Sequence, residues 1–173
     1  MLTVSQETWL THLSDIQTIK IVPFDSSCGQ KFEKLRKEIQ GYLGEGVLVE
    51  HCGASSLGIS GQDEIDAYIP VSTQDFNSYV SLLQKLFGTP RSHYPQERVK
   101  FVTEKEGKHI DVFVINKEHD DWKNCMKFQN YLRVHKESLE EYRKLKENLS
   151  GKSVCEYYRE KLLFINKILE KTQ

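Results

Sequence analysis

Residues 64 to 71 read Glu-Ile-Asp-Ala-Tyr-Ile-Pro-Val, and this stretch decides the fold that the sequence predicts. The apolar and branched residues from Ile65 onward are typical of a strand. Residues two apart in an extended strand project from the same face, so Glu64 and Asp66 would present adjacent carboxylates. Two ionised carboxylates repel each other, and hard oxygen ligands of this kind suit magnesium or manganese as the compensating cation. A pair of acids is also common by chance in a chain with 25 of them, so the stretch predicts a strand and makes Glu64 and Asp66 candidates for part of a metal site.

The segment before this strand predicts a second strand that runs into a tight turn. Residues 47–52 read Val-Leu-Val-Glu-His-Cys and lead into the small residues Gly53-Ala54-Ser55-Ser56. Such residues would let backbone N–H groups, and the hydroxyl of Ser55 or Ser56, approach a phosphate closely. A turn of this composition is more often an ordinary loop than a phosphate cradle, so the turn alone does not establish a site.

A third acidic residue interrupts an apolar strand later in the chain. Residues 98–103 alternate between polar and apolar, and after a short turn residues 109–115 return as a hairpin partner. Asp111 lies between two branched apolar residues of the returning strand, where an unpaired carboxylate would be costly if buried. If this strand lies beside the one that carries Asp66, then Glu64, Asp66 and Asp111 converge. Three converging carboxylates would bind one or two metal ions, as in phosphoryl transfer.

The rest of the chain predicts helices around these strands. Apolar residues at three- and four-residue steps predict helices from Phe32 to Leu43 and from Phe76 to Leu86, and the pattern is helical after Lys117. The fold class is therefore α+β (α/β), a mixed β-sheet flanked by helices with a helical C-terminal portion. We expect a helical extension over residues 1–17 and one domain over 18–173, divided into a mixed sheet core at 18–117 and a helical cap at 118–173.

Composition limits the kinds of partner. Lys and Arg total 24 against 25 Asp and Glu, so no global field draws the chain onto nucleic acid and any anionic ligand must be bound locally. The four cysteines form no CxxC pair, which argues against a zinc knuckle or a redox dithiol. The N-terminus has no basic region followed by an apolar run, and no stretch has the length of a membrane span. We therefore expect a cytoplasmic protein without membrane contact.

Several motifs resemble the GrpB family, which belongs to the nucleotidyltransferase superfamily. Residues 51–56, His-Cys-Gly-Ala-Ser-Ser, are similar to the family's His-Val-Gly-Ser-Thr-Ser, and residues 21–25 are similar to its opening motif. The C-terminal half is the most similar part and contributes Trp122, Phe128, Asn130 to His135, Tyr142, Lys144, Tyr157, Lys161 and Phe164. The resemblance implies a nucleotidyltransferase-like fold with the turn at Gly53 to Ser56, the acidic pair at Glu64 and Asp66, and the third acid at Asp111.

The chain departs from the family pattern at three positions. The serine usual after the glycine is Ala54, and a lysine often found before the acidic strand is Gln62. Many relatives carry the acidic pair at a slightly later register, which would pair Asp66 with Tyr68 and leave one ligand. Because of these departures, a site that has lost its catalytic activity is an alternative to an active one.

Four further residues are candidates for the same site. The resemblance makes His51, at the mouth of the turn, a phosphate-binding candidate, with a purely structural role as the alternative. Arg133 lies in the most similar segment and would bind phosphate bidentately, unless it forms a surface ion pair. Lys161 lies one turn from Tyr157 on a helix and would close over the same cleft. His109 shares a strand face with Asp111 and is either its partner or an exposed hairpin residue.

The leading expectation is an enzyme that transfers a nucleotidyl or related phosphoryl group from a nucleoside triphosphate to an unidentified acceptor. Glu64, Asp66 and Asp111 would hold Mg²⁺, or Mn²⁺, and Asp111 would help activate an acceptor hydroxyl. The balanced net charge weakens the case for RNA as the acceptor without excluding it. One alternative is a nucleotide-binding module without turnover, and another is a regulatory protein whose C-terminal helices recognise a partner.

Overall fold

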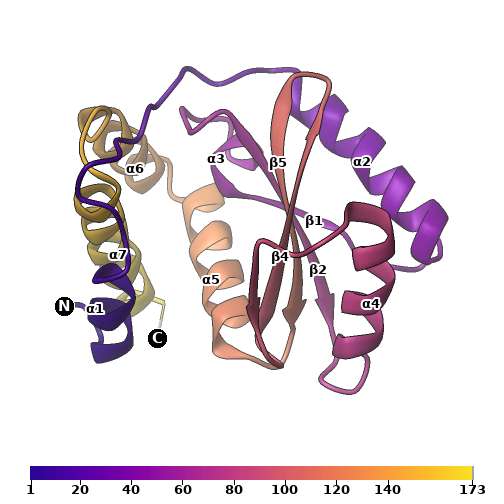
Figure 1. Cartoon of the computed structure of the whole chain (residues 1–173). Helices are drawn as coiled ribbons and strands as arrows, with labels where there is room; N and C mark the ends of the chain where they lie inside the picture. Colours follow the sequence, from indigo (N-terminus) through magenta and orange to yellow (C-terminus); the bar gives the residue numbers. More distant parts are fainter. Residues whose placement is uncertain (173) are drawn as a thin grey trace. The chain divides into compact units, whose positions relative to one another are not determined.

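The chain divides into two compact units in a computed structural model that describes residues 1–172 (Figure 1). The sheet unit comprises Asp25–Gly58 and Asp63–Cys125, and the helical unit comprises Met1–Phe24, Ile59–Gln62 and Met126–Gln173. Gln173, the last residue of the predicted helical cap, lies outside the described residues. The short segment at 59–62 thus belongs to the helical unit although both of its neighbours in sequence belong to the sheet unit.

The sheet unit is built on five strands in the order β1-β2-β5-β4-β3. In chain order the strands are β1 (Glu50–Cys52), β2 (Glu64–Val71), β3 (Ser92–Tyr94), β4 (Arg98–Lys105) and β5 (Lys108–Asn116). The central pair, β2 and β5, is parallel, and the other three pairs are antiparallel. The mixed sheet expected from the sequence is therefore confirmed, and the two strands that carry the predicted acids are direct neighbours.

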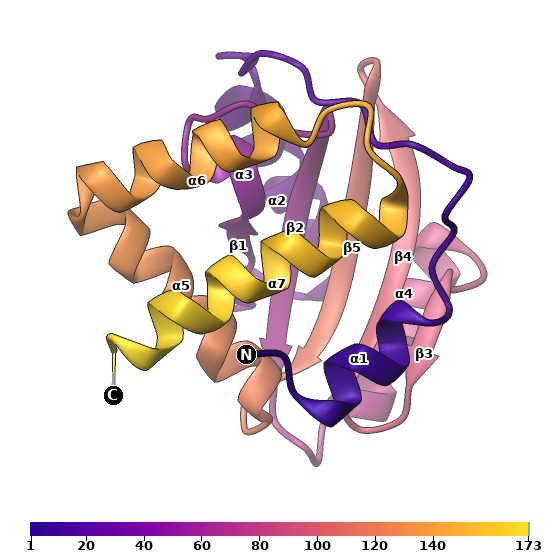
Figure 2. The same cartoon turned by 90° about the vertical axis from the view of Figure 1, so that its left-hand side faces the viewer.

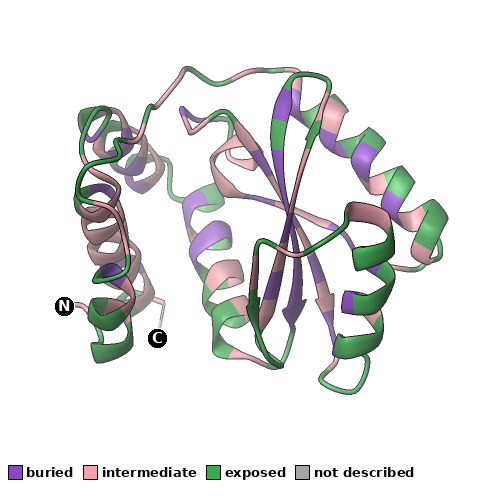
Figure 3. Cartoon of the chain, in the orientation of Figure 1, coloured by how far each residue is buried: buried purple, intermediate pink, exposed green. Residues whose placement is uncertain are grey.

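Two helices cover one face of this sheet, α2 (Cys28–Leu43) and α4 (Phe76–Phe87) (Figure 1). Each helix buries one stripe of apolar residues, and buried and exposed residues alternate along α2 (Figure 3). Strand β2 buries every second residue against this layer. The buried members of the resulting core include Phe32, Leu35, Ile39, Ile65, Ala67, Ile69, Phe76, Leu83, Ile110 and Val112. Burying one such large side chain contributes about 1.5–3 kcal/mol relative to exposure, so this layer holds the sheet unit together.

Strands β4 and β5 form the predicted hairpin. Its two-residue turn, Glu106 and Gly107, has positive φ at both positions (50° and 72°), which matches the twist of antiparallel strands. The turn is tied to α2 by an ion pair of 2.6 Å between Lys34 and Glu106 and by contact between Lys105 and Glu38. One turn of helix, α3 (Gly53–Ser56), follows β1 where the sequence predicted a turn.

The helical unit consists of α1 (Val4–Leu10), the C-terminal part of α5 (Asp120–Val134), α6 (Lys136–Asn148) and α7 (Val154–Glu170). Helix α1 lies beside α7 (Figure 2), with Trp9 edge-on to Tyr158 at 5.3 Å and Glu7 paired with Arg159 at 3.0 Å. A helix of seven residues is marginal on its own, so these contacts stabilise it. In the part of the chain that the structure describes, no helix is both long and apolar enough to cross a membrane.

Candidate functional site

The face of the sheet opposite α2 and α4 carries the acidic residues that the sequence singled out. The parallel register of β2 and β5 pairs Glu64 with His109 and Asp66 with Asp111. Because side chains alternate along both strands, these four project from the face that α2 and α4 leave uncovered. The structure thus brings the three predicted carboxylates to one face of two adjacent strands. This face of β2 and β5, which carries Glu64, Asp66, His109 and Asp111, is the acidic face.

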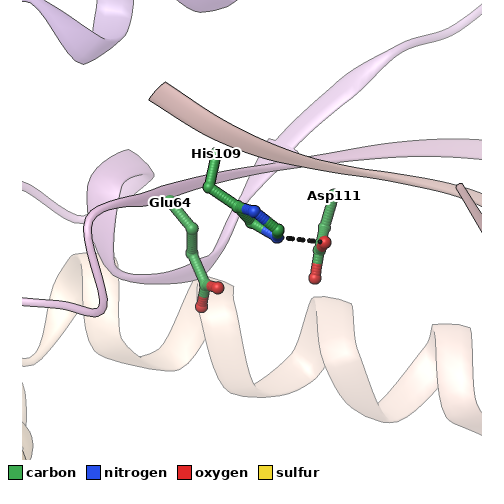
Figure 4. Close-up of side chains that lie close together, drawn as sticks. All are labelled: Glu64, His109 and Asp111. Carbon is green, nitrogen blue, oxygen red and sulfur yellow. Dashed lines mark hydrogen bonds and ion pairs between the residues drawn. The ribbon is translucent and has the colours of Figure 1, made fainter. Parts of the chain in front are cut away.

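Three side chains of this face come close enough to hold one ion. Glu64, His109 and Asp111 each offer one ligand atom, and these atoms all lie within 4.8 Å of one another (Figure 4). The imidazole Nε2 of His109 lies 3.0 Å from Oδ1 of Asp111. This group, found among residues 1–172, includes His109 and not Asp66. The sequence-based set of metal ligands is therefore brought together only in part.

The carboxylate of Asp66 lies against the glycine turn. A Cβ added at Gly53 would meet Oδ2 of Asp66 at 1.9 Å, and Gly53 has a φ of +74°. Both facts require glycine, because any side chain would collide with the carboxylate and because positive φ strains other residues. The turn and Asp66 therefore form one packed unit at the edge of the acidic face.

Lys100 of β4 forms an ion pair with Asp111. Its Nζ donates a hydrogen bond of 2.8 Å to Oδ2 of Asp111, whose side chain is only 8% exposed. Both carboxylate oxygens of Asp111 are thus engaged, one by Lys100 and the other by His109. These contacts offset the energetic cost of burying the carboxylate of Asp111 in an apolar strand.

The donor set of the acidic face suits a divalent cation. Glu64, Asp66 and Asp111 bring three carboxylates together, and β4 brings two basic side chains, Lys100 and Arg98, so negative charge is in excess. Two carboxylates and one imidazole are ligands that manganese accepts, whereas magnesium prefers oxygen donors throughout. The residues present therefore fit a divalent cation, and manganese better than magnesium.

Comparison with known proteins identifies the family. The family model described as GrpB protein matches residues 18–171. The chain belongs to the GrpB family. The resemblance read from the sequence motifs is thereby confirmed.

Individual relatives of this GrpB-family chain agree with that assignment. A UPF0157 protein of Vibrio cholerae is 24% identical over 156 residues, which cover 90% of this chain and 82% of that protein. The crystal structure of conserved protein GrpB from Enterococcus faecalis matches with a TM-score of 0.70 and 22% identity, covering 88% of this chain and 96% of that one. This likeness shows a shared fold. A structure of the Cid1 poly(U) polymerase matches at a TM-score of 0.48 with 8% identity, over 83% of this chain and 47% of that one.

The surroundings of Tyr68 bear on which residue, Glu64 or Tyr68, is the partner of Asp66 in the metal site. Its ring stacks on Phe113 of β5 at 4.4 Å and lies 6.0 Å from the ring of Trp122. Burial, and to a smaller extent the nearby Cys125 and Asp66, raise the pKa of the Tyr68 phenol well above its ordinary value. A neutral phenol in an aromatic stack is a poor metal ligand, which favours Glu64 over Tyr68 as the partner of Asp66.

The predicted phosphate contacts of the turn have other partners. His51 pairs in register with Ala67, so it projects from the α2 side of the sheet, and its ring stacks on Phe32 at 4.3 Å. Its Nε2 lies 3.0 Å from Oγ of Ser55, and the hydroxyl of Ser56 donates a hydrogen bond of 2.9 Å to the Gly53 carbonyl. The phosphate-binding role of these side chains stays a prediction.

The basic residues predicted for phosphate binding lie in the helical unit. Arg133, on α5, donates a hydrogen bond of 3.2 Å to the amide oxygen of Asn130. Lys161, on α7, has its Nζ 5.2 Å from the ring centre of Tyr158. Neither is among the residues that the sheet unit brings together, and their role in phosphate binding also stays a prediction.

Two basic residues of the acidic face were missed by sequence reasoning. Arg98 and Lys100 lie two apart on β4, so they share the face that carries Asp111. The guanidinium of Arg98 lies 5.5 Å from the ring centre of Tyr94 and 5.9 Å from that of Phe113. The polar-apolar alternation of residues 98–103 was the signal that could have placed both on one face.

Proposed function

We propose that this GrpB-family chain is a metal-dependent nucleotidyltransferase that acts on a nucleoside triphosphate and an acceptor hydroxyl. The observation that carries the proposal is the convergence of Glu64, Asp66, His109 and Asp111 on one face of β2 and β5. Carboxylates on adjacent strands beside a glycine turn form an arrangement suited to phosphoryl transfer, where positioning and charge stabilisation supply most of the catalysis. The superfamily resemblance of the sequence motifs agrees with this assignment.

The metal ligands in this proposal are Glu64, His109 and Asp111, with Asp66 beside them. A divalent cation held there, Mn²⁺ or Mg²⁺, would neutralise the charge that develops on the phosphate oxygens. The packing of Asp66 against Gly53 keeps the turn beside the acids, which supports a phosphate contact from backbone N–H groups of the turn. In this proposal the metal ligands and the glycine turn both come from the sheet unit.

The transfer step moves one proton to the protein. An acceptor oxygen forms a bond to the α-phosphorus of the triphosphate, the bond from that phosphorus to the bridging oxygen breaks, and pyrophosphate leaves with the electron pair. The acceptor proton passes to the carboxylate of Asp111, the most buried acid of the face. His109, which contacts Asp111 Oδ1, orients this carboxylate.

A second candidate function is a nucleotide-binding module without turnover. The ion pair between Lys100 and Asp111 favours it, because a lysine already neutralises the acid that would accept the proton. Ala54 and Gln62, which replace a serine and a lysine usual in the family, favour it as well.

Binding and transfer assays separate the two candidates. Calorimetric titration with Mn²⁺ and Mg²⁺, alone and with each nucleoside triphosphate, measures binding, and incubation of labelled triphosphate with cell extract measures transfer. The enzyme predicts metal-dependent label transfer that disappears in Asp66→Asn and Asp111→Asn. The module predicts binding of metal and nucleotide without transfer.

A matched control removes a carboxylate elsewhere in the sheet unit. Glu33 lies on α2, at the other face of the sheet, and pairs with Arg36. The variant Glu33→Gln should bind metal and nucleotide as the wild type does. If the folded wild-type chain binds neither metal nor nucleotide, both candidate functions are wrong.

A further inference from the structure

The acidic face carries two basic side chains on β4. Lys100 pairs in register with Phe113 and reaches diagonally to Asp111, whose own partner on β4 is Val102. Arg98 projects from the same face two residues earlier, about 6.8 Å along an extended strand. Charges of both signs thus line neighbouring strands of one face. The acids Glu64, Asp66 and Asp111 lie on β2 and β5, and β4 carries the bases Arg98 and Lys100 together with one acid, Glu104, opposite His109.

Arg98 is held in place by aromatic rings and not by an acid. Its guanidinium lies within 6 Å of the ring centres of Tyr94 and Phe113. Over the described residues, 1–172, no carboxylate forms an ion pair with Arg98, and its buried Nε has no hydrogen-bond partner. An arginine that no carboxylate neutralises, on the face that carries the candidate metal ligands, is suited to an anion, since its planar fork matches phosphate oxygens.

Lys100 and a metal ion would compete for the same carboxylate. The lysine Nζ contacts Oδ2 of Asp111, and Asp111 also supplies a ligand atom of the group formed with Glu64 and His109. A cation bound to that group repels the ammonium and lowers the negative charge that holds it. The lysine is then available to a second anion on the same face.

We propose that Arg98 and Lys100 form the polyphosphate subsite of the acidic face, and that Lys100 changes its partner from Asp111 to a phosphate oxygen when a divalent cation binds. The inference rests on the proposed function, because it assigns the anion contacts of that same site. It makes metal binding and polyphosphate binding cooperative, since each removes an obstacle to the other.

Calorimetry on the whole chain tests the inference, with Mn²⁺ alone and then with tripolyphosphate added under excess Mn²⁺. Lys100→Met removes the competitor of the metal, so Mn²⁺ should bind about tenfold more tightly. The same variant loses a charge-assisted contact to the anion, so tripolyphosphate should bind about tenfold more weakly. Opposite changes in the two affinities are the signature of a lysine that changes partner.

Arg98 variants test the other half of the subsite. Arg98→Met should weaken tripolyphosphate binding by about tenfold and leave Mn²⁺ affinity unchanged, because Arg98 contacts no metal ligand. Arg98→Lys keeps the charge and loses the planar fork, so its tripolyphosphate affinity should lie between those of Arg98→Met and the wild type. Equal tripolyphosphate binding by Arg98→Met and the wild type would remove Arg98 from the subsite.

Two controls separate a change of partner from general effects. Lys105→Met removes the same charge from the far end of β4, where the lysine contacts Glu38, and should alter neither affinity. Lys100→Arg keeps a cation beside Asp111 and should retain the Mn²⁺ affinity of the wild type. Unchanged Mn²⁺ affinity in a folded Lys100→Met would overturn the partner change.

The experiment also distinguishes failure of the inference from failure of the proposed function. If the wild type binds no Mn²⁺, the metal-dependent function and the partner change of Lys100 both fail. Tripolyphosphate binding in metal-free buffer that is lost in Arg98→Met would then support the anion contact of Arg98 alone. If the wild type binds Mn²⁺ and neither β4 variant alters tripolyphosphate binding, only the subsite is wrong.

Discussion

The two faces of strands β2 and β5 are made by alternate residues of the same segments and have opposite properties. Toward α2 and α4, β2 presents Ile65, Ala67 and Ile69, each fully buried. Toward the other side the same strand presents Glu64 and Asp66, which are partly exposed. The first face is apolar along its length and stabilises the fold by packing. The second packs only part of its length, through the stack of Tyr68 on Phe113, and gathers charges at its other end.

The charges on the two faces are also balanced differently. Lys108, only 6% exposed, lies on the α2 side, with its Nζ in contact with Asp63 and 3.0 Å from Oδ2 of Asp25. Burial acts to lower the pKa of Lys108, but hydrogen bonds to the two acids outweigh it and raise the pKa. Lys31 also pairs with Asp25 at 3.5 Å, so two lysines meet two acids on the α2 side. On the opposite face the two bases Lys100 and Arg98 are set against four carboxylates, those of Glu64, Asp66, Glu104 and Asp111. The comparison shows that the excess of negative charge belongs to the face proposed to bind a ligand.

The strongest test of this comparison replaces neighbouring residues that project from opposite faces. Ile65→Ala should lower the free energy of unfolding by about 3 kcal/mol, because it leaves a cavity in the core. Glu64→Ala, one residue away, should change it by less than about 1 kcal/mol. Urea unfolding of both variants measures the difference. Equal losses would show that the two faces contribute alike to stability.

The turn beside Asp66 provides the next largest effect. Gly53→Ala should cost about 2 kcal/mol, from positive φ together with the collision between the new methyl group and the Asp66 carboxylate. The control is Gly107→Ala, which has a similar φ of +72° but meets no atom within 4 Å, and should cost about 1 kcal/mol. Adding Asp66→Ala to Gly53→Ala should recover part of the loss. No recovery in this double variant would contradict the collision.

Metal-dependent stability sharpens the comparison further. In metal-free buffer Glu64→Gln should raise the free energy of unfolding by about 0.5 kcal/mol, because it relieves repulsion among the acids. Mn²⁺ at ten times its Kd should stabilise the wild type by about 1.4 kcal/mol and the variant much less. Thermal unfolding with and without Mn²⁺ measures both changes. Equal stabilisation of wild type and variant would remove Glu64 from the metal site.

The smallest expected effect is the pH dependence of the balanced charges near α2. Hydrogen bonds from the Ser27 hydroxyl and amide, together with Lys108, hold the pKa of Asp25 well below its ordinary value of 3.8. A pKa depressed in the folded state contributes stability above the unfolded value and loses it as pH falls toward the folded value. Asp25→Asn should therefore be less stable than the wild type at pH 7, and the difference should shrink below pH 3.8. Urea unfolding at several pH values checks this, and a difference independent of pH would exclude the carboxylate as its cause.

Periodicity predicted the parts of the fold that depend on local pattern. The alternation of residues 64–71 and 98–103 predicted the faces of β2 and β4, and apolar spacing predicted the helices around Phe32 and Phe76. Asp111 was found because an acid inside an apolar strand needs a partner. These features are visible in sequence because each is decided by neighbouring residues.

Contacts that depend on register or side-chain length were not visible. His51 projects to the α2 side only because the three-residue strand β1 pairs it with Ala67, and a sequence does not carry that register. Lys100 reaches Asp111 diagonally, past its own register partner, through the length of its side chain. The segment 59–62 joins the helical unit through an isolated β-bridge between Val22 and Gly61. No local sequence pattern predicts this pairing.

The close approach of Gly53 to Asp66 has a consequence for how the family can diverge. The two positions share one volume, so a mutation that adds a side chain at 53 is tolerated only after the carboxylate at 66 has been shortened or lost. The reverse order is open, because an alanine at 66 leaves glycine acceptable. Descendants of an ancestor with this turn should therefore lose the acid before the glycine. A homologue with a bulky residue at position 53 should also lack the carboxylate at position 66.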